Sequence, residues 1–304
     1  MEEVLRKTTA TATATPTSFP TVTPDLPTFY FTDVATDTGK RTLWVVTVFM
    51  ALSSLAFYGM AMRVPVQKRL FHVLTAFITT IAFISYFAMA SGDGINFHVY
   101  KEKTTKHHTA MEVYSRQVYW ARYVDVSLAL EVLMVFDHPL LLADLAFLAG
   151  LNGASMLVAI FADVIMVLTG LFAAFGNSDG QKWGYYTMGC AAYLVIVYQL
   201  AINGRTAISN KDTKTKTFFT MIAGYTLLLW TAYPIVWGIG DGARLMNVDA
   251  EVVCYAILDV LAKPIFGFWL LTTHDKMSRN TASIEGFWAY GLTQEGAIRV
   301  GDGA

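Results

Sequence analysis

Apolar residues gather in seven long runs after residue 41, and short polar segments separate them. The runs cover residues 43–62, 70–90, 118–148, 154–175, 183–202, 218–239 and 248–272. Each is close to or above the roughly 20 residues that an α-helix needs to cross the hydrocarbon core of a bilayer. The pattern therefore predicts an all-α membrane protein, a seven-transmembrane-helix bundle whose termini lie on opposite sides of the membrane.

Basic residues mark the loops on one side of this bundle. Residues 63–69 hold three basic and no acidic residues, and residues 205–216 hold four basic residues against a single aspartate. By the positive-inside rule these loops are cytoplasmic, which places the N-terminus outside and the C-terminus inside. The long loop 91–117 is then external, and its β-like stretch 96–100 predicts a short hairpin.

The composition fits an integral membrane protein. Of the 304 residues, 55% are hydrophobic and 15% are charged, whereas about 25% charged is usual in soluble domains. A net charge of −1 gives no reason to expect nucleic acid as a partner. Both cysteines, Cys190 and Cys254, fall inside apolar runs, which argues against a disulfide framework.

Three regions are expected along the chain. Residues 1–41 are rich in Thr, Pro and Ala and are predicted to be a disordered extracellular tail. Residues 42–275 form the helical domain, and residues 276–304 form a cytoplasmic tail. No cleavable signal peptide is evident at the N-terminus.

Lys263 lies near the middle of the seventh apolar run, four residues after Asp259. A lysine at mid-depth in a bilayer costs several kcal/mol, so it is normally neutralised, paired or used covalently. The spacing of four residues puts the amine and the carboxylate on one helix face. An amine in a dry pocket beside a carboxylate is suited to forming a protonated Schiff base with an aldehyde. A structural ion pair inside a helix bundle is the alternative.

Further ionisable residues fall within or beside the third and fourth runs: Arg122, Asp125, Glu131, Asp137, His138, Asp144 and Asp163. Carboxylates at several depths around a buried amine suit a proton relay, although satisfied pairs that fix helix packing would give the same pattern.

The sixth run carries an aromatic stripe. Trp230, Tyr233, Pro234 and Trp237 recur at helical spacing on one face. Such a stripe is usual in core packing. It could equally form one wall of a slot for a long, flat, apolar ligand.

Five segments together resemble the microbial rhodopsins, specifically the fungal proton-pumping type. They are residues 121–125, 139–145, 162–166, 230–237 and 258–263, and the likeness covers nearly all of residues 42–275. The resemblance implies all-trans retinal bound to Lys263 as a protonated Schiff base and light-driven pumping of protons from the cytoplasm to the outside.

Specific roles follow from the resemblance. Asp125 and Asp259 would be counterions, with Asp125 the proton acceptor, Arg122 one turn outward of it, and Asp144 the cytoplasmic proton donor. The remaining implied residues would line retinal or release protons: Tyr86, Asp163, Met166, Gly170, Trp230, Tyr233, Pro234 and Trp237 for the pocket, and Asp241 and Glu251 for release. The implied surroundings are plasma-membrane lipid, with the proton as the transported ion and a homo-oligomer allowed. No metal site is expected, and no enzyme is proposed because no hydrolytic or transferase constellation is visible.

The third run departs from the family pattern in length. Pro139 and Asp144 follow Asp125 by 14 and 19 residues, whereas the family spacings are six and eleven. Nineteen helical residues rise about 28 Å and eleven about 16 Å, so Asp125 and Asp144 cannot both hold their usual places on one regular helix.

Two registers are then open. If Arg122 and Asp125 keep theirs, Phe136 takes the donor position. If Pro139 and Asp144 keep theirs, Leu133 takes the acceptor position and leaves Asp259 as the only close counterion. Residues 126–138 could also loop out or be a translated intron. The alternative function is therefore a retinal photosensor or signalling opsin with weak or no pumping.

Overall fold

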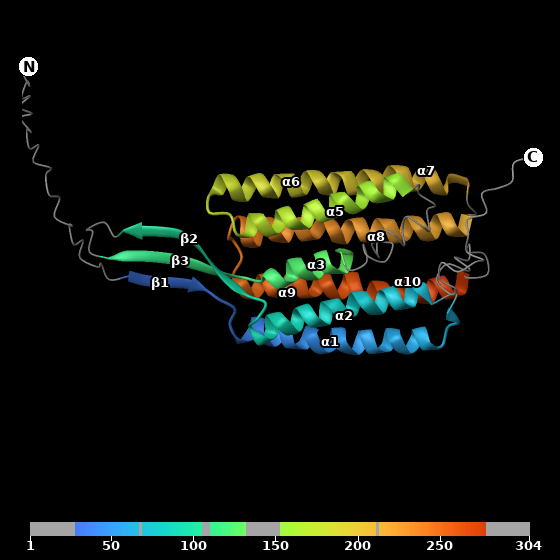
Figure 1. The fold of residues 1–304 in the computed structure, drawn as a ribbon, viewed down its shortest axis with the longest axis horizontal. Coiled ribbons are helices and arrows are strands. Elements are labelled where there is room, and N and C mark those ends of the chain that lie inside the picture. Colours follow the sequence, from blue (N-terminus) through green and yellow to red (C-terminus); the bar gives the residue numbers. More distant parts are fainter. Residues whose placement is uncertain (1–27, 67–68, 105–109, 132–152, 211–212, 278–304) are drawn as a thin grey trace, which may run out of the picture.

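A bundle of helices with a small sheet projecting from one end makes up the part of the chain that the computed structural model describes, residues 28–66, 69–104, 110–131, 153–210 and 213–277. Seven helices lie side by side along the long axis of the molecule (Figure 1). The predicted seven-helix fold is confirmed. Six of the helices are long and apolar enough to cross a membrane, and the third is described over 12 residues.

Six helices follow their apolar runs closely, and the third is described over only part of its run. Their bounds are α1 (Asp37–Met62), α2 (Leu70–Ser91), α3 (Trp120–Glu131), α5 (Gly153–Ala174), α6 (Asp179–Tyr198), α8 (Thr213–Trp237), α9 (Val248–Val260) and α10 (Phe266–Met277). The seventh helix is α9 and α10 joined by the π-helical segment η6 (Leu261–Ile265). Short segments extend two other helices: η3 (Gln199–Gly204), α7 (Arg205–Ala207) and η4 (Ile208–Asn210) follow α6, and η5 (Gly238–Gly242) follows α8.

Capping residues fix where several helices begin and end. Ser178 and Asn247 accept hydrogen bonds from backbone N–H groups in the first turns of α6 and α9, and Thr36 does the same for α1. These side chains satisfy N–H groups that have no partner within the helix. Gly92 ends α2 in the left-handed region at φ 98°, which a residue without Cβ adopts readily.

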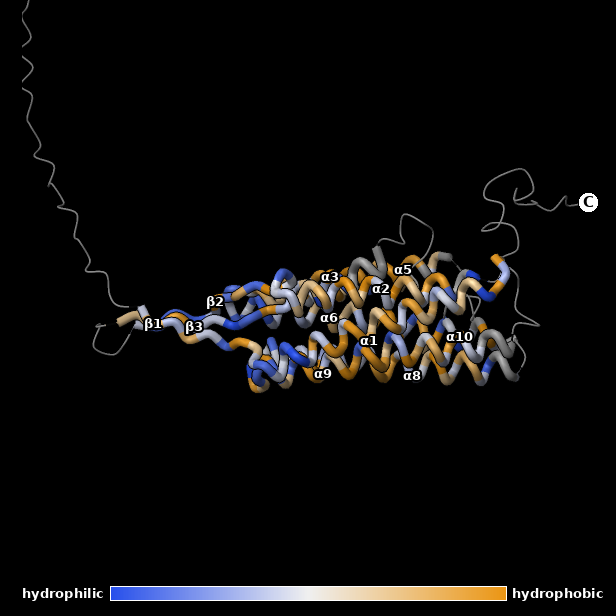
Figure 2. The backbone as a smooth tube through the Cα atoms, turned by 90° about the horizontal axis from the view of Figure 1, so that it is seen from below, coloured by the Kyte–Doolittle hydropathy of each residue, from blue (hydrophilic) through white to orange (hydrophobic). Residues whose placement is uncertain are grey.

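The helices pack as a closed ring. In chain order α1 packs on α2, α2 on α3, α3 on α5 and α5 on α6, and α9 packs on both α8 and α1. Tyr193 of α6 joins the ring to α8, because its hydroxyl lies 2.7 Å from the Thr231 hydroxyl. Figure 2 shows hydrophobic residues along the helices and hydrophilic ones gathered where the bundle meets the sheet. Many large apolar side chains on the outer faces are exposed, as a lipid-facing surface requires.

The sheet has three strands in the order β1-β3-β2. They are β1 (Thr28–Asp33), β2 (Asn96–Thr104) and β3 (Met111–Val118), with β2 and β3 antiparallel and β1 parallel to β3. The hairpin predicted in the loop after the second helix is confirmed, and it is longer than the stretch that predicted it.

The expected boundary of the N-terminal tail is wrong. Residues 28–41 are expected to belong to a disordered tail, but Thr28–Asp33 form β1 and α1 begins at Asp37. The strand forms because its partner β3 lies 83 residues further along, with Asp33 opposite Arg116. Asp249 fixes the start of α1 by accepting hydrogen bonds from the backbone N–H groups of Thr36 and Gly39 at 2.8 and 3.1 Å. Both partners, β3 and Asp249, are far away in the sequence, so local patterns do not predict these contacts.

Candidate functional site

Lys263 is buried between two carboxylates in the middle of the bundle. Its Nζ contacts Asp125 of α3 and lies 3.2 Å from Oδ1 of Asp259, one turn earlier on its own helix. The side chains of the two aspartates are 1% and 2% exposed. The negative charges of Asp125 and Asp259 stabilise the protonated form of the Lys263 amine between them.

The two carboxylates differ in their remaining partners. Asp259 accepts hydrogen bonds from the hydroxyl of Tyr86 at 2.5 Å and from that of Tyr233 at 2.7 Å, one at each oxygen. Lys263 Nζ donates a hydrogen bond to Oδ2 of Asp125. The buried Oδ1 of Asp125 has no hydrogen-bond partner among the described residues. Donors to a carboxylate stabilise its ionised form. Asp125 is thus the carboxylate with an oxygen left for a proton.

The helix is irregular at Lys263 itself. Pro264 has no backbone N–H to give, and the chain runs in π-helical form from Leu261 to Ile265. Short π-helical segments inside α-helices are frequent at functional sites. The Tyr225 hydroxyl of α8 donates to the Leu261 carbonyl at 3.0 Å, so this irregular turn is held from the neighbouring helix.

A cavity of about 220 Å³ leads away from the Lys263 side chain. Six helices contribute to its wall, and most of the wall residues are aromatic or aliphatic. They are Ile78, Arg122, Tyr123, Asp163, Met166, Val167, Gly170, Tyr186, Gly189, Cys190, Tyr193, Trp230, Tyr233, Pro234, Trp237, Tyr255, Asp259, Ala262 and Lys263. The arrangement is an apolar slot with an amine at one point of its wall.

Aromatic rings fix the shape of the slot between α6 and α8. Tyr186 stacks on Trp237 with ring centroids 4.9 Å apart and planes 14° from parallel. The Tyr186 hydroxyl donates to the Pro234 carbonyl at 3.0 Å, and the Trp237 indole N–H donates to the Tyr123 hydroxyl at 2.8 Å. These bonds satisfy the polar atoms of the rings, so the faces turned to the slot stay apolar.

Asp163 of α5 is a polar exception in this wall. It is 1% exposed, and both carboxyl oxygens are buried without a hydrogen-bond partner among the described residues. Desolvation disfavours a charged carboxylate at such a place.

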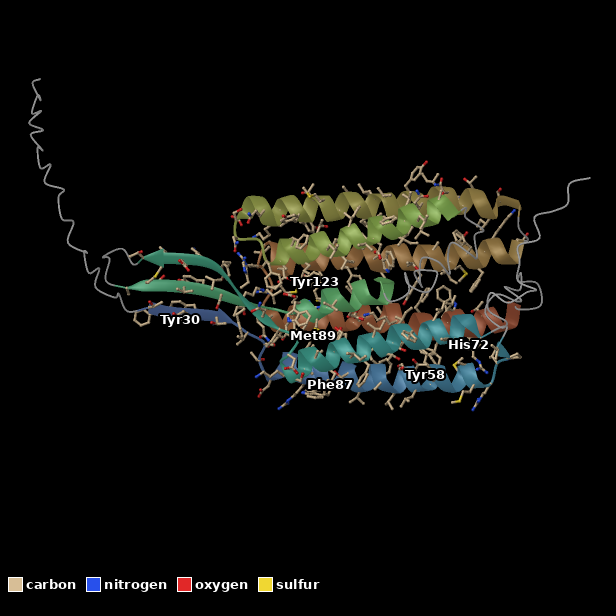
Figure 3. The ribbon with its side chains drawn as sticks, in the orientation of Figure 1. Tyr30, Tyr58, His72, Phe87, Met89 and Tyr123 are labelled. Carbon is tan, nitrogen blue, oxygen red and sulfur yellow. The ribbon has the colours of Figure 1, made fainter. Side chains whose placement is uncertain are left out.

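A cluster of charged side chains lies between the amine site and the sheet. Arg122 donates to Glu251 Oε1 at 3.0 Å, and its guanidinium lies 3.8 Å from the ring centroid of Tyr255. Arg116 of β3 donates to Glu251 Oε2 at 2.8 Å. The Tyr123 hydroxyl donates to Asp241 at 3.3 Å. Figure 3 places Tyr123 toward the sheet end of the bundle and His72 near the opposite end.

Comparison with known proteins decides the family. Residues 38–277 match the family model described as bacteriorhodopsin-like protein. The chain belongs to the bacteriorhodopsin-like family. The resemblance to microbial rhodopsins is therefore confirmed, and members of this family are light-driven pumps or sensors, not enzymes.

Fungal rhodopsins are among its relatives. Opsin-1 of Neurospora crassa is 47% identical over 99% of this chain and 97% of that protein. The opsin-like protein carO of Fusarium fujikuroi is 39% identical over 83% of this chain and 79% of that protein. The crystal structure of a light-driven proton pump from Leptosphaeria maculans is 48% identical, covers 81% of this chain and 99% of that one, and superposes with a TM-score of 0.73.

Most sequence-predicted site residues of this rhodopsin come together. Lys263, Asp125 and Asp259 meet, and Arg122, Asp163, Met166, Gly170 and the four-residue stripe of α8 lie on the cavity wall. Tyr86 is expected on that wall, but it is not among the residues that line the cavity. Its buried ring points its hydroxyl at Asp259, so it supports the carboxylate instead of lining the slot.

The described part of the third helix, Trp120–Glu131, keeps Arg122 and Asp125 in register, which fits the first register and a looped-out segment alike. Asp125 contacts Lys263, as the register that keeps Arg122 and Asp125 in place requires. The opposite register, which left Asp259 as the only close carboxylate, is wrong. Asp144, the predicted donor, lies outside the described residues, as do Leu133 and Phe136.

One wall of the slot, on α6, and one charged residue, Arg116, are not among the site residues predicted from the sequence. Tyr186, Gly189, Cys190 and Tyr193 lie at helical spacing on α6, the same signal that found the stripe on α8. Arg116 gave no signal, because it lies on a strand in the loop after the second helix and reaches Glu251 only through the tertiary fold.

Proposed function

We propose that this rhodopsin is a light-driven proton pump that binds all-trans retinal covalently at Lys263 and moves protons outward. The observation that carries the proposal is the buried amine, held by Asp125 and Asp259 and opening into an aromatic slot. Light-driven proton pumps of Leptosphaeria maculans and Coccomyxa subellipsoidea are among its structural neighbours.

The residues present fit retinal. A long polyene needs an apolar slot with a reactive amine on its wall, and the cavity offers the rings of Trp230, Tyr186 and Trp237 together with Lys263 Nζ. Bound retinal would supply visible absorption and a light-driven change of shape that displaces the charge at Nζ. The protein would hold the ends of the ligand and exclude water.

Asp125 is the favoured proton acceptor. Its carboxylate touches Lys263 Nζ and keeps one oxygen without a donor among the described residues. Asp259 is engaged by two tyrosine hydroxyls, which stabilise it as an anion. A proton leaving Nζ would therefore go to Asp125, while Asp259 stays charged.

The outward path follows the charged side chains toward the sheet. Arg122 lies near Asp125 in α3 and pairs with Glu251, and Asp241 lies beyond it. The positive-inside rule places the sheet end outside. Asp144 is proposed as the cytoplasmic donor from the resemblance alone.

Two measurements on one sample test the proposal. The full chain is expressed in membranes with added all-trans retinal, its visible spectrum is recorded, and the external pH is followed during illumination. A visible band with light-driven external acidification, abolished by a protonophore, is expected. The absence of a band would overturn retinal binding, and a band without acidification in intact cells would overturn pumping.

The photosensor remains a second candidate because of one observation. The third run is eight residues longer than the family spacing between Asp125 and Asp144. If that length separates the donor from Lys263, light absorption would persist while transport slows, and the second measurement distinguishes the two functions.

A further inference from the structure

We propose that Arg116, carried by β3, and Asp33, carried by β1, form an outer ion pair that positions Glu251 and Asp241 and sets the pH at which a proton leaves them. This inference rests on the proposed function, because it concerns the external end of the proton path.

Arg116 is built into the site. It is 4% exposed although it belongs to a strand of an external loop. Besides Glu251, it donates to the Met246 carbonyl at 3.0 Å, and its Nε lies 3.6 Å from Asp241 Oδ1. It also pairs with Asp33. One guanidinium therefore connects both strands of the parallel pair to two helices.

The charges of the cluster leave room for one proton. Two guanidinium groups, of Arg116 and Arg122, contact three carboxylates, of Asp33, Asp241 and Glu251. With all three carboxylates ionised, negative charge exceeds positive charge by one. Protonation of one carboxyl group would make the directly contacting set neutral, which favours retention of a proton in a buried place.

Exposure gives the cluster a direction. The side chain of Asp33 is 39% exposed, whereas those of Asp241 and Glu251 are 6% and 3% exposed. Asp33 is thus the carboxylate at the water side, and Arg116 stands between it and the buried pair. On release the O–H bond of a buried carboxyl group breaks, the proton passes to water, and the carboxylate left behind is compensated by Arg116.

Other charged and titratable groups face this cluster from each neighbouring element. They are Tyr119 just before α3, Tyr123 of α3, Arg244 after η5, and Asp249 and Tyr255 of α9. Arg244 stacks on Tyr100 with its guanidinium 3.8 Å from the ring centroid and forms no ion pair in the described residues. These groups stay the same in the variants below, so changes in the pH profile report Arg116 and Asp33.

The two outer residues should act in opposite directions. Arg116→Gln removes a cation beside Glu251 and Asp241, which favours their protonated form. Proton release at neutral pH is then delayed, and the midpoint pH of release rises. Asp33→Asn removes the exposed carboxylate that pairs with Arg116. More of the positive charge of Arg116 then acts on Asp241 and Glu251, and the midpoint pH of release falls. An opposite charge at this range is worth about one to three pH units, and the Asp33 effect is smaller because it acts through Arg116.

The test uses the full chain with retinal in lipid vesicles. A pH-indicator dye records when protons appear after a laser flash, across a series of pH values. Arg116→Gln should raise the midpoint pH of proton release by about one unit or more, and Asp33→Asn should lower it. Arg116→Lys keeps the positive charge, so its midpoint should lie between those of the wild type and Arg116→Gln. Lys101→Gln, which removes an exposed cation from β2, is the matched control and should leave the profile unchanged.

A dark infrared titration of buried carboxyl groups supplies an independent readout. It needs no transport, so it decides the inference even if the protein does not pump, and failure of pumping is then separable from failure of this proposal. Opposite shifts of the carboxyl titration in Arg116→Gln and Asp33→Asn support the ion pair. Shifts of the carboxyl titration in the same direction, or no shifts, would overturn the proposed role of the ion pair. If Arg116→Gln does not fold, the carboxyl titrations of Asp33→Asn and Arg116→Lys test the same role.

Discussion

Tyr225 and Leu261 are joined by a hydrogen bond from the tyrosine hydroxyl to the leucine carbonyl, 3.0 Å long and two residues before Lys263. The bond crosses from α8 to η6, the irregular turn that carries the amine. The Tyr225 ring also stacks on Phe266 just beyond that turn, with planes 14° from parallel. One side chain thus holds the irregular turn at two points.

Loss of that hydroxyl should destabilise the turn. In Tyr225→Phe the ring contacts stay, but the Leu261 carbonyl loses a donor in apolar surroundings, which costs about 1–3 kcal/mol. The thermal midpoint of the visible band should fall. Tyr198→Phe, at a ring that is 51% exposed, is the control and should change little. Equal midpoints in both variants would contradict a bracing role.

Lys263→Ala should abolish the visible band in the presence of retinal, because no other described lysine opens into the slot. Absorption spectra of the purified variant check this. Lys101→Ala, at an exposed lysine of β2, should keep the band. An unchanged band in Lys263→Ala would refute the covalent site.

Asp125→Asn and Asp259→Asn should differ although both residues contact Lys263. Asp125→Asn removes the carboxylate with an oxygen available for a proton, so external acidification should fall at least about tenfold while a visible band persists. Asp259→Asn instead removes an anion held by two tyrosines, and its main effect should be on band position and protein stability. Light-induced pH changes and spectra measured side by side decide this. Wild-type pumping by Asp125→Asn would show that another group accepts the proton.

His98 should make the three-stranded sheet sensitive to acid. It is 9% exposed on β2, and its ring meets the Gly176 carbonyl at 3.2 Å. Burial lowers the pKa of His98 below its usual value of about 6.5, the positive charges of Arg244 and Lys182 lower it further, and the Gly176 hydrogen bond opposes them. The folded state therefore binds fewer protons than the unfolded state just below that value. Stability from His98 is complete above about pH 6.5 and is lost as the pH falls through the lowered pKa.

The measurement is the thermal midpoint at about pH 5 and about pH 7.5 for the wild type and His98→Gln. The variant should show a smaller difference between the two conditions, because glutamine does not titrate. An equal or larger difference would assign the acid sensitivity to other groups.

Deletion of eight residues from the segment 126–138 should bring the third helix to the family spacing. Acidification should then increase, because Asp125 and Asp144 would lie about 16 Å apart along one helix. Initial pumping rates per absorbing molecule check this. Loss of a pumping activity that the intact chain possesses would instead make the segment a functional element.

The sequence predicted the bundle and the amine site well for a physical reason. Helix periodicity and buried charges are local signals, so Asp259, Lys263 and the stripe from Trp230 to Trp237 could be assigned to helix faces directly. The tyrosine partners of Asp259 were not predicted as partners, because Tyr86 and Tyr233 come from helices whose relative rotation the sequence does not give.

Contacts between distant segments were beyond local patterns. Arg116 and Asp33 belong to paired strands that are separated in sequence by α1, α2 and β2. The TFYFT run beside the Thr- and Pro-rich tail has the aromatic and β-branched composition of a strand, and this signal could have set the tail boundary correctly.

The parallel pairing of β1 with β3 constrains the order of biosynthesis. β1 is made first, but its partner follows two complete helices and a hairpin strand, so β1 must wait unpaired while they insert. Closing a loop of this length has an entropic cost that the pairing and the contacts between α1 and α2 must offset. β1 therefore cannot reach its place before β3 has been made, and N-terminal fusions or cuts before α1 should impair maturation more than their distance from Lys263 suggests.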